Sequence, residues 1–173
     1  MKVEIRTAAE LLTPERAGEW AARRAQRDDP VLRAIWQEFI ETGGPVTLEA
    51  TACGLPGLTH EDAEARAAAL DAADLIELDG DHVRLAYPFT TGPNAFEVVL
   101  PGNRPRYACC AIDALGVAPM VGHPVTLRSR CHQSGAPLVF DVDPVAGPRR
   151  APPGCLAWVE RGRWGGDRLS GFL

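Results

Sequence analysis

The chain has 173 residues, 46% of them hydrophobic, and a formal net charge of −5. This length allows one ordinary domain or two small ones with a buried core, so we expect a folded globular protein. No apolar run approaches the roughly 20 residues that a membrane-spanning helix needs. The acidic N-terminal stretch also lacks the apolar centre of a signal peptide. We therefore expect a cytoplasmic protein with no membrane partner.

The first ninety residues alternate helical patterns with one hairpin pattern. Residues 1–29 are expected to form an N-terminal helical arm or a dimerisation element. From Pro30 the apolar residues recur at helical spacing until Gly43. A short helix, a helix opened by a capping box at Thr59–Asp62, and a β-hairpin around Asp79–Gly80 follow. This order is typical of a winged helix-turn-helix, so we predict a winged-helix-like module over residues 30–90.

The charge of this module excludes nucleic acid as a partner. Residues 44–90 carry two arginines against nine acidic side chains. Because phosphate contacts need clustered Lys and Arg, DNA would be repelled. We therefore expect the module to pack against the rest of the chain, or to bind a protein partner through its acidic region.

Residues 91–173 predict a small α+β unit with a mostly antiparallel sheet. A strand is expected over 95–100, followed by a turn at 101–105 and a helix from about Tyr107 to Leu115 capped by Gly116. Two further strands are expected on either side of the turn His132–Gly135, and a last short run, CLAWVE, begins at Cys155. The expected fold class of the whole chain is therefore α+β.

The predicted helix carries two adjacent cysteines and an aspartate. Cys110 and Asp113 are three residues apart and project from one helical face, while Cys109 is turned about 100° away. The positive end of the helix would favour a thiolate at Cys110. A carboxylate this close disfavours that charge, so the pair should share one proton. In the alternative interpretation Cys110 is a small buried hydrophobe, and Asp113 only accepts a backbone hydrogen bond.

The remaining cysteines do not predict a zinc site. The five cysteines are sparse and odd in number, so we expect free thiols. No C-x-x-C pair is present, and adjacent Cys131–His132 does not match a structural zinc spacing. Cys131, at a strand end, is expected to be structural or to be a soft-metal ligand, while His123 is expected in a loop. No cofactor is required by any motif.

Three segments together resemble one known family. The run Tyr107–Leu115, then Pro119–Gly122, and then Ser129–Pro137 resemble the core of the alkylmercury (organomercurial) lyases, the MerB family. The resemblance extends over roughly residues 30–160, because those enzymes also carry an N-terminal winged-helix-like module that does not bind DNA. The Cys-x-x-Asp helix combined with the Cys-x-x-Ser-Gly-x-Pro turn carries the specificity of the match.

The resemblance implies roles for individual residues. Cys110 matches the catalytic, mercury-binding cysteine, Asp113 matches the catalytic aspartate, and Cys131 matches a cysteine treated as structural. The family cleaves a carbon–mercury bond by protonolysis, which suits soft thiolate ligation of a soft metal. Its second catalytic cysteine follows the strand that CLAWVE resembles, and this sequence reaches Leu173 at about that point. Cys109 or Cys155 would then have to supply a second thiol.

Three functions remain open from the sequence. The first is a lyase-like enzyme that acts through its cysteine on an organometallic small molecule, with Cys110 and Asp113 catalytic. The second is a sulfur-transfer or C–S bond-forming enzyme of small-molecule biosynthesis, in which Cys110 carries sulfur covalently. The third is a non-catalytic protein that binds a soft metal, Hg(II) or Cu(I), through Cys110 and neighbouring thiols.

Overall fold

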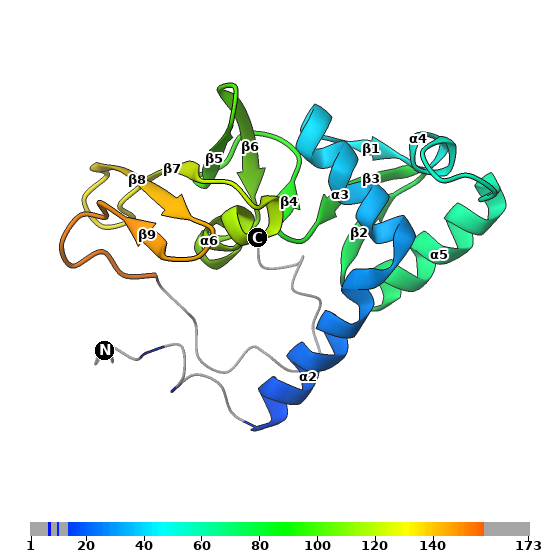
Figure 1. Cartoon of the computed structure of the whole chain (residues 1–173), viewed down its shortest axis with the longest axis horizontal. Coiled ribbons are helices and arrows are strands. Elements are labelled where there is room, and N and C mark those ends of the chain that lie inside the picture. Colours follow the sequence, from blue (N-terminus) through cyan, green and yellow to red (C-terminus); the bar gives the residue numbers. More distant parts are fainter. Residues whose placement is uncertain (1–6, 8–9, 11–13, 158–173) are drawn as a thin grey trace.

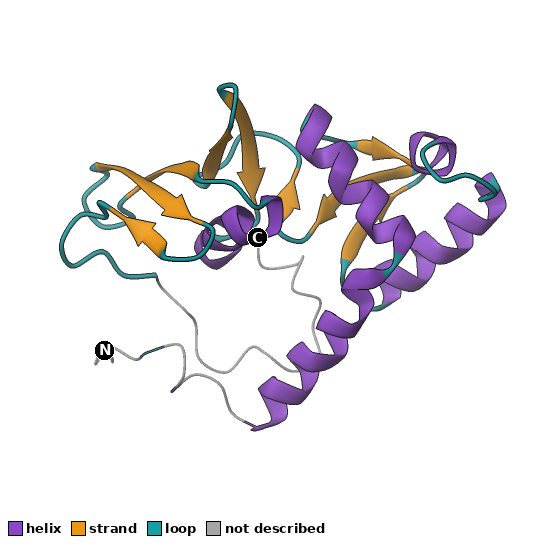
Figure 2. Ribbon diagram, viewed as in Figure 1, coloured by secondary structure: helices purple, strands orange, loops and turns teal. Residues whose placement is uncertain are grey.

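One antiparallel sheet runs through residues 46–149 of the part of the chain that the structure describes (Figures 1 and 2). The computed structural model describes residues 7, 10 and 14–157. Its strands follow the order β1-β3-β4-β6-β5-β7-β8-β9, with β2 paired to β3 beside this path, and the pairings are antiparallel. The predicted α+β class with an antiparallel sheet is confirmed. Within the described ranges, no helix is both long and apolar enough to cross a membrane.

The described chain opens with helices α2 (Pro14–Ala25), η1 (Gln26–Asp28) and α3 (Pro30–Thr42). The start of α3 is fixed by Asp29, whose carboxylate accepts two main-chain N–H bonds from the first turn. Its end is fixed by Gly43 at φ +90°, a left-handed conformation that glycine adopts without strain. The predicted helix ending at a glycine pair is therefore confirmed. Helix α2 projects away from the sheet (Figure 1).

The next elements also follow the sequence prediction. The short helix and the hairpin are present, and the helix between them begins with the capping box of Thr59 and Asp62. Gly80, at φ +63°, provides the turn of the hairpin. These elements are β1 (Val46–Thr47), α4 (Leu48–Cys53), α5 (His60–Ala72), β2 (Ile76–Asp79) and β3 (His82–Ala86).

The sheet continues without a break into the second half of the chain. Strand β4 pairs with β3 on one side and with β6 on the other, so pairing crosses residue 90. Helix α6 packs against β5, β6, β7 and β8. The elements of this half are β4 (Phe89–Thr90), β5 (Glu97–Leu100), β6 (Arg104–Ala108), α6 (Ala111–Val121), β7 (Val125–Arg130), β8 (Pro137–Asp143) and β9 (Gly147–Arg149).

The predicted bounds of the cysteine-bearing helix are wrong at both ends. Tyr107 lies in β6, where it pairs with both β4 and β5. Pairing on two sides holds this segment extended and overrides its local preference. Helix α6 therefore begins only at Ala111, continues through Gly116 and ends at Val121, with Gly122 as its C-cap. Residues 155–157 form no strand, and the rest of the predicted last run lies outside the described residues.

One buried guanidinium joins the two halves of the chain. Arg106 of β6 is 7% exposed. It donates to the carbonyl of Ile40 at 2.7 and 3.0 Å, to that of Glu41 at 2.7 Å, and to its neighbour Pro105 at 2.7 Å. These carbonyls at the end of α3 carry the negative end of the helix dipole, which suits a cation. Arg106 therefore ties the strand that leads to the cysteines to the end of α3.

A single apolar core lies beneath both halves of the sheet. Its buried members come from α3, α5, α6 and the strands, which shows that the halves do not have separate cores. They include Ile35, Phe39, Leu70, Phe89, Val98, Val117 and Val142.

Candidate functional site

Cys110 stands at the junction between β6 and α6. Its backbone is extended, at φ −151° and ψ 178°, and it is the N-cap residue of α6. Its Sγ accepts a hydrogen bond from the main-chain N–H of Asp113 at 3.5 Å. Serine, threonine, asparagine and aspartate are the usual residues in this role, and here a cysteine sulfur satisfies the free amide. The sulfur is half-buried and faces the first turn of the helix.

Asp113 occupies the first turn of α6 and, after burial, is the main cause of the raised pKa of the Cys110 thiol. Burial, and then the negative charge of the Asp113 carboxylate, raise the pKa of Cys110 to about 12. A side-chain hydrogen bond between the two groups acts in the same direction. The amides of Ile112 and Asp113 act in the opposite direction but are outweighed. The resting site therefore holds a thiol with its proton directed toward a carboxylate.

This geometry changes one part of the sequence prediction. Cys110 was expected inside the first helical turn, where the helix end would favour a thiolate. It lies one residue before the helix, and the pKa of its thiol is raised, not lowered, because burial and the Asp113 charge exceed the effect of the amides. The expected proximity of Cys110 and Asp113 is present in the structure. Their roles remain a prediction.

Cys109 lies in different surroundings from its neighbour. It is 5% exposed, and its Sγ lies 3.4 Å from the Phe89 carbonyl, to which the thiol donates. Its main-chain N–H donates to the Pro88 carbonyl at 3.0 Å. Burial, followed by the charge of Asp113, raises the pKa of this thiol well above its usual value. Cys109 is thus a neutral, buried hydrogen-bond donor.

Cys131 and Cys155 are free thiols, the first partly buried and the second exposed. Cys131 follows β7 and closes the predicted turn, since its N–H donates to Ala136 O and its carbonyl accepts from Gly135 N, both at 2.8 Å. A hydrogen bond from the Ser134 hydroxyl, followed by bonds from main-chain amides, lowers the pKa of Cys131. Cys155 is exposed in a loop. In the part of the chain that the structure describes, no three His, Cys, Asp or Glu side chains gather to hold a metal ion.

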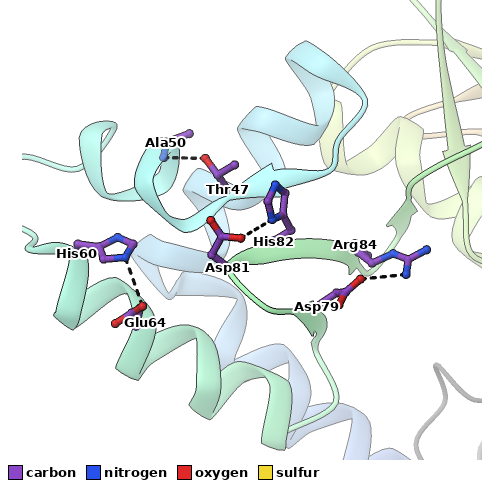
Figure 3. A network of polar contacts seen from close by, with 8 residues as sticks. All are labelled: Thr47, Ala50, His60, Glu64, Asp79, Asp81, His82 and Arg84. Atoms are coloured by element: carbon purple, nitrogen blue, oxygen red, sulfur yellow. Dashed lines mark hydrogen bonds and ion pairs between the residues drawn. The ribbon is translucent and has the colours of Figure 1, made fainter.

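Polar clusters occur elsewhere but do not form a second centre. On α5 and the β2–β3 hairpin, His60 pairs with Glu64 at 3.3 Å, His82 with Asp81 at 2.5 Å, and Arg84 with Asp79 at 3.2 Å (Figure 3). Each pair is separate and solvent-exposed. A hollow bounded by Pro45, Asp79, His82, Arg84, Thr91 and Gly92 lies beside them. Neither Cys110 nor Asp113 borders it, so the thiol chemistry is not located there.

Two contributors to the site were missed in the sequence. The carbonyls of Pro88 and Phe89, which hold Cys109, come from the start of β4 and the turn before it, about twenty positions earlier in the chain. Ile112, between the thiol and the carboxylate, is 48% exposed and leaves an apolar surface beside them. Strand pairing brings β4 next to the cysteines, and no local sequence pattern predicts that pairing. The sequence shows that Ile112 is apolar, but it does not show that the side chain is exposed.

Two comparisons with known proteins bear on this site. The family model described as alkylmercury lyase matches residues 89–153, which include both cysteines and Asp113. A solved structure, the mercury-bound form of MerB2, superposes with a TM-score of 0.61 at 18% identity and covers 79% of this chain. The match covers 66% of that chain, just under two thirds of its length. The predicted resemblance is thereby confirmed: residues 89–153 match the alkylmercury lyase family, and the fold is similar to that of MerB2.

Proposed function

We propose that this protein is an alkylmercury lyase-like enzyme that cleaves a carbon–mercury bond with Cys110 and Asp113. The observation that carries the proposal is the N-cap position of Cys110, which places its thiol against the Asp113 carboxylate within the segment that matches alkylmercury lyase. A soft sulfur suits mercury, and a carboxyl group can deliver a proton. This chemistry is favoured over sulfur transfer and over metal binding without turnover.

The first step exchanges the ligands of the substrate's mercury. The substrate is an organomercury cation held by a small thiolate. As Cys110 Sγ bonds to mercury, its proton moves to the Asp113 carboxylate, and the small thiolate leaves. Because the resting thiol is already hydrogen-bonded to that carboxylate, the proton travels a short path. The raised pKa of Cys110 keeps the proton available until mercury replaces it.

The second step breaks the carbon–mercury bond. The Asp113 carboxyl group gives its proton to the carbon, which leaves as a hydrocarbon while mercury(II) stays on Cys110 and Asp113 becomes a carboxylate again. Two small thiolates from solution then bind mercury and remove it, and Cys110 takes up a proton from water. No electron is gained or lost by any group. Exposed Ile112 offers an apolar surface to the organic part of the substrate.

Hydrocarbon release tests this proposal directly. The full chain is incubated with phenylmercury and excess thiol, and benzene is measured in the headspace. We expect steady release from the wild type and background release from Cys110→Ala. Cys53→Ala is the matched control, because Cys53 is an exposed free thiol on α4. Equal release from the wild type and Cys110→Ala, above the rate without protein, would contradict the proposal.

We also propose that residues 30–90 form a winged-helix-like module that serves as a support for residues 91–173 and does not bind DNA. The order α3-β1-α4-α5-β2-β3 supports it, as does the Arg106 bond to the end of α3. Glu61, Asp62 and Glu64 of α5 are exposed, and the one arginine of this helix, Arg66, pairs with Asp29. Fluorescence anisotropy with duplex DNA at low salt should show no binding, and a salt-dependent rise would contradict this role.

A further inference from the structure

The two adjacent cysteines have opposite surroundings. The Cys110 sulfur faces the Asp113 amide and carboxylate at the start of α6. The Cys109 sulfur points back to β4, where its thiol donates to the Phe89 carbonyl at 3.4 Å. The peptide bond between the two cysteines therefore connects the end of β6 to the start of α6. Because the residues share this bond, a displacement of Cys109 would also displace Cys110.

The group that Cys109 binds is itself held firmly. Phe89 is 1% exposed, and its ring stacks on Phe39 of α3 with centroids 6.1 Å apart and planes 9° apart. Phe89 also pairs in register with Ala108, the residue before Cys109. The carbonyl of Ala108 accepts a further bond from Asn94 Nδ2 at 2.8 Å. The acceptor of the Cys109 thiol is thus fixed by α3 from one side and by strand pairing from the other.

We propose that Cys109 is a positioning residue: its thiol bonds to Phe89 of β4 and its main-chain amide to Pro88 just before β4, and together they hold Cys110 against Asp113. It is not a second mercury ligand. This inference rests on the function proposed above for Cys110 and Asp113. The geometry supports this role, because the side chain is 5% exposed and both its Sγ and its main-chain N–H are already bonded, to the carbonyls of Phe89 and Pro88. A buried, protonated sulfur engaged with a carbonyl is poorly suited to capture a metal, because the thiolate is the ligand form.

The side chain at this position must satisfy two conditions. It must be small and apolar enough to lie 5% exposed beneath the sheet, and it must donate a hydrogen bond to the Phe89 carbonyl. Cysteine meets both, since a buried thiol behaves as a small hydrophobe with a weak donor. Serine keeps the donor, and alanine keeps only the small size. A comparison of Cys109→Ser with Cys109→Ala therefore separates the effect of the hydrogen bond from the effect of side-chain packing.

Two readouts on the full-length protein test the proposal. The first is the rate at which iodoacetamide alkylates Cys110 at pH 8, located by peptide mass. The second is benzene release from phenylmercury. If Cys109→Ala loosens the anchor, Cys110 becomes more solvated and moves away from the Asp113 charge, so its pKa falls and alkylation becomes faster. Benzene release becomes slower, because the proton path is broken. We expect changes of about two- to tenfold, the range for loss of one hydrogen bond.

Controls distinguish anchoring from general weakening. Cys109→Ser should restore both rates to near wild type. Val117→Ala removes buried volume from α6 without touching Cys109, so it should lower the melting temperature and leave Cys110 alkylation unchanged. If Cys109→Ala matches the wild type in both readouts, Cys109 has no positioning role. If Cys109→Ser and Cys109→Ala lose benzene release equally while alkylation is unchanged, the sulfur itself acts as a ligand, and the proposal is overturned.

Failure of the proposed function would give a different result. A wild-type protein that releases no benzene refutes the lyase proposal by itself. The alkylation readout does not depend on mercury, so it still decides whether Cys109 positions Cys110. A faster alkylation in Cys109→Ala that is reversed in Cys109→Ser supports positioning under either outcome.

Discussion

The region before residue 90 and the region after it are built in different ways. In the first, α3 begins at the Asp29 cap and ends at Gly43, and α5 begins at the Thr59 cap, so these helix ends depend on local signals. In the second, the cysteine site depends on strands that are distant in sequence, because β6 is extended only through pairing with β4 and β5. The first region therefore gives support, and the second contains the reactive groups.

Arg106 is the point where this contrast can be tested, because it belongs to the second region and binds the first. Its guanidinium joins the strand that leads to Cys110 to the last carbonyls of α3. The carbonyls at a helix end otherwise lack partners. If the first region only supports the second, substitutions in it should lower the free energy of unfolding without changing the reactivity of Cys110. Substitutions beside Cys110 should then change that reactivity alone.

The largest effect is expected at Asp113, in the second region. Asp113→Asn should reduce benzene release about 10²- to 10⁴-fold, because the general acid is lost. The same change should speed alkylation of Cys110 at pH 8. The Asp113 charge is, after burial, the main cause that raises the pKa of Cys110 to about 12. Removing it lowers that pKa and increases the thiolate fraction. Slower alkylation in Asp113→Asn would contradict the proposed coupling.

Replacement of Arg106 comes next and should affect both regions. Arg106→Leu leaves the carbonyls of Ile40 and Glu41 without their donor at the partly buried end of α3, which should cost about 2 kcal/mol of unfolding free energy. Urea denaturation followed by circular dichroism measures this loss. Arg106→Lys keeps the charge but not the planar fork, so it should recover only part of it. Wild-type stability in Arg106→Leu would show that the two regions hold together without this bond.

A smaller loss is expected for a cap within the first region. Thr47 caps α4, and its hydroxyl accepts from Ala50 N at 3.1 Å (Figure 3). Thr47→Ala should lower the unfolding free energy by about 1 kcal/mol, the usual value of an N-cap. The alkylation rate of Cys110 should not change. Thr47→Ser keeps the hydroxyl and serves as the control. A changed rate in Thr47→Ala would mean that support and chemistry are not separable.

The smallest effect is expected for a surface ion pair. His60 and Glu64 are 3.3 Å apart on α5, with side chains 52% and 54% exposed. Exposed pairs of this kind contribute less than about 0.5 kcal/mol. Glu64→Gln should therefore leave both the denaturation midpoint and Cys110 alkylation near wild type. A clear loss of stability would show that the carboxylates of this region do more than face solvent.

The sequence alone determined the elements whose signals are local. The capping box at Thr59, the glycine after α3, the hairpin around Gly80 and the strands on either side of the Cys131 turn were all predicted, because each depends on neighbours a few positions away. The spacing of Cys110 and Asp113, with the family resemblance, also singled out the candidate pair.

Only the tertiary structure decided how that pair is held. The start of α6 follows from the pairing of β6 with β4 and β5. The raised pKa of Cys110 follows from burial and from the Asp113 carboxylate. The role proposed for Cys109 follows from its bond to Phe89, whose ring stacks on Phe39 of α3. These groups are brought together by strand pairing and burial across long stretches of chain. Burial also affects the pKa of a thiol, and the extent of burial cannot be read from the linear sequence.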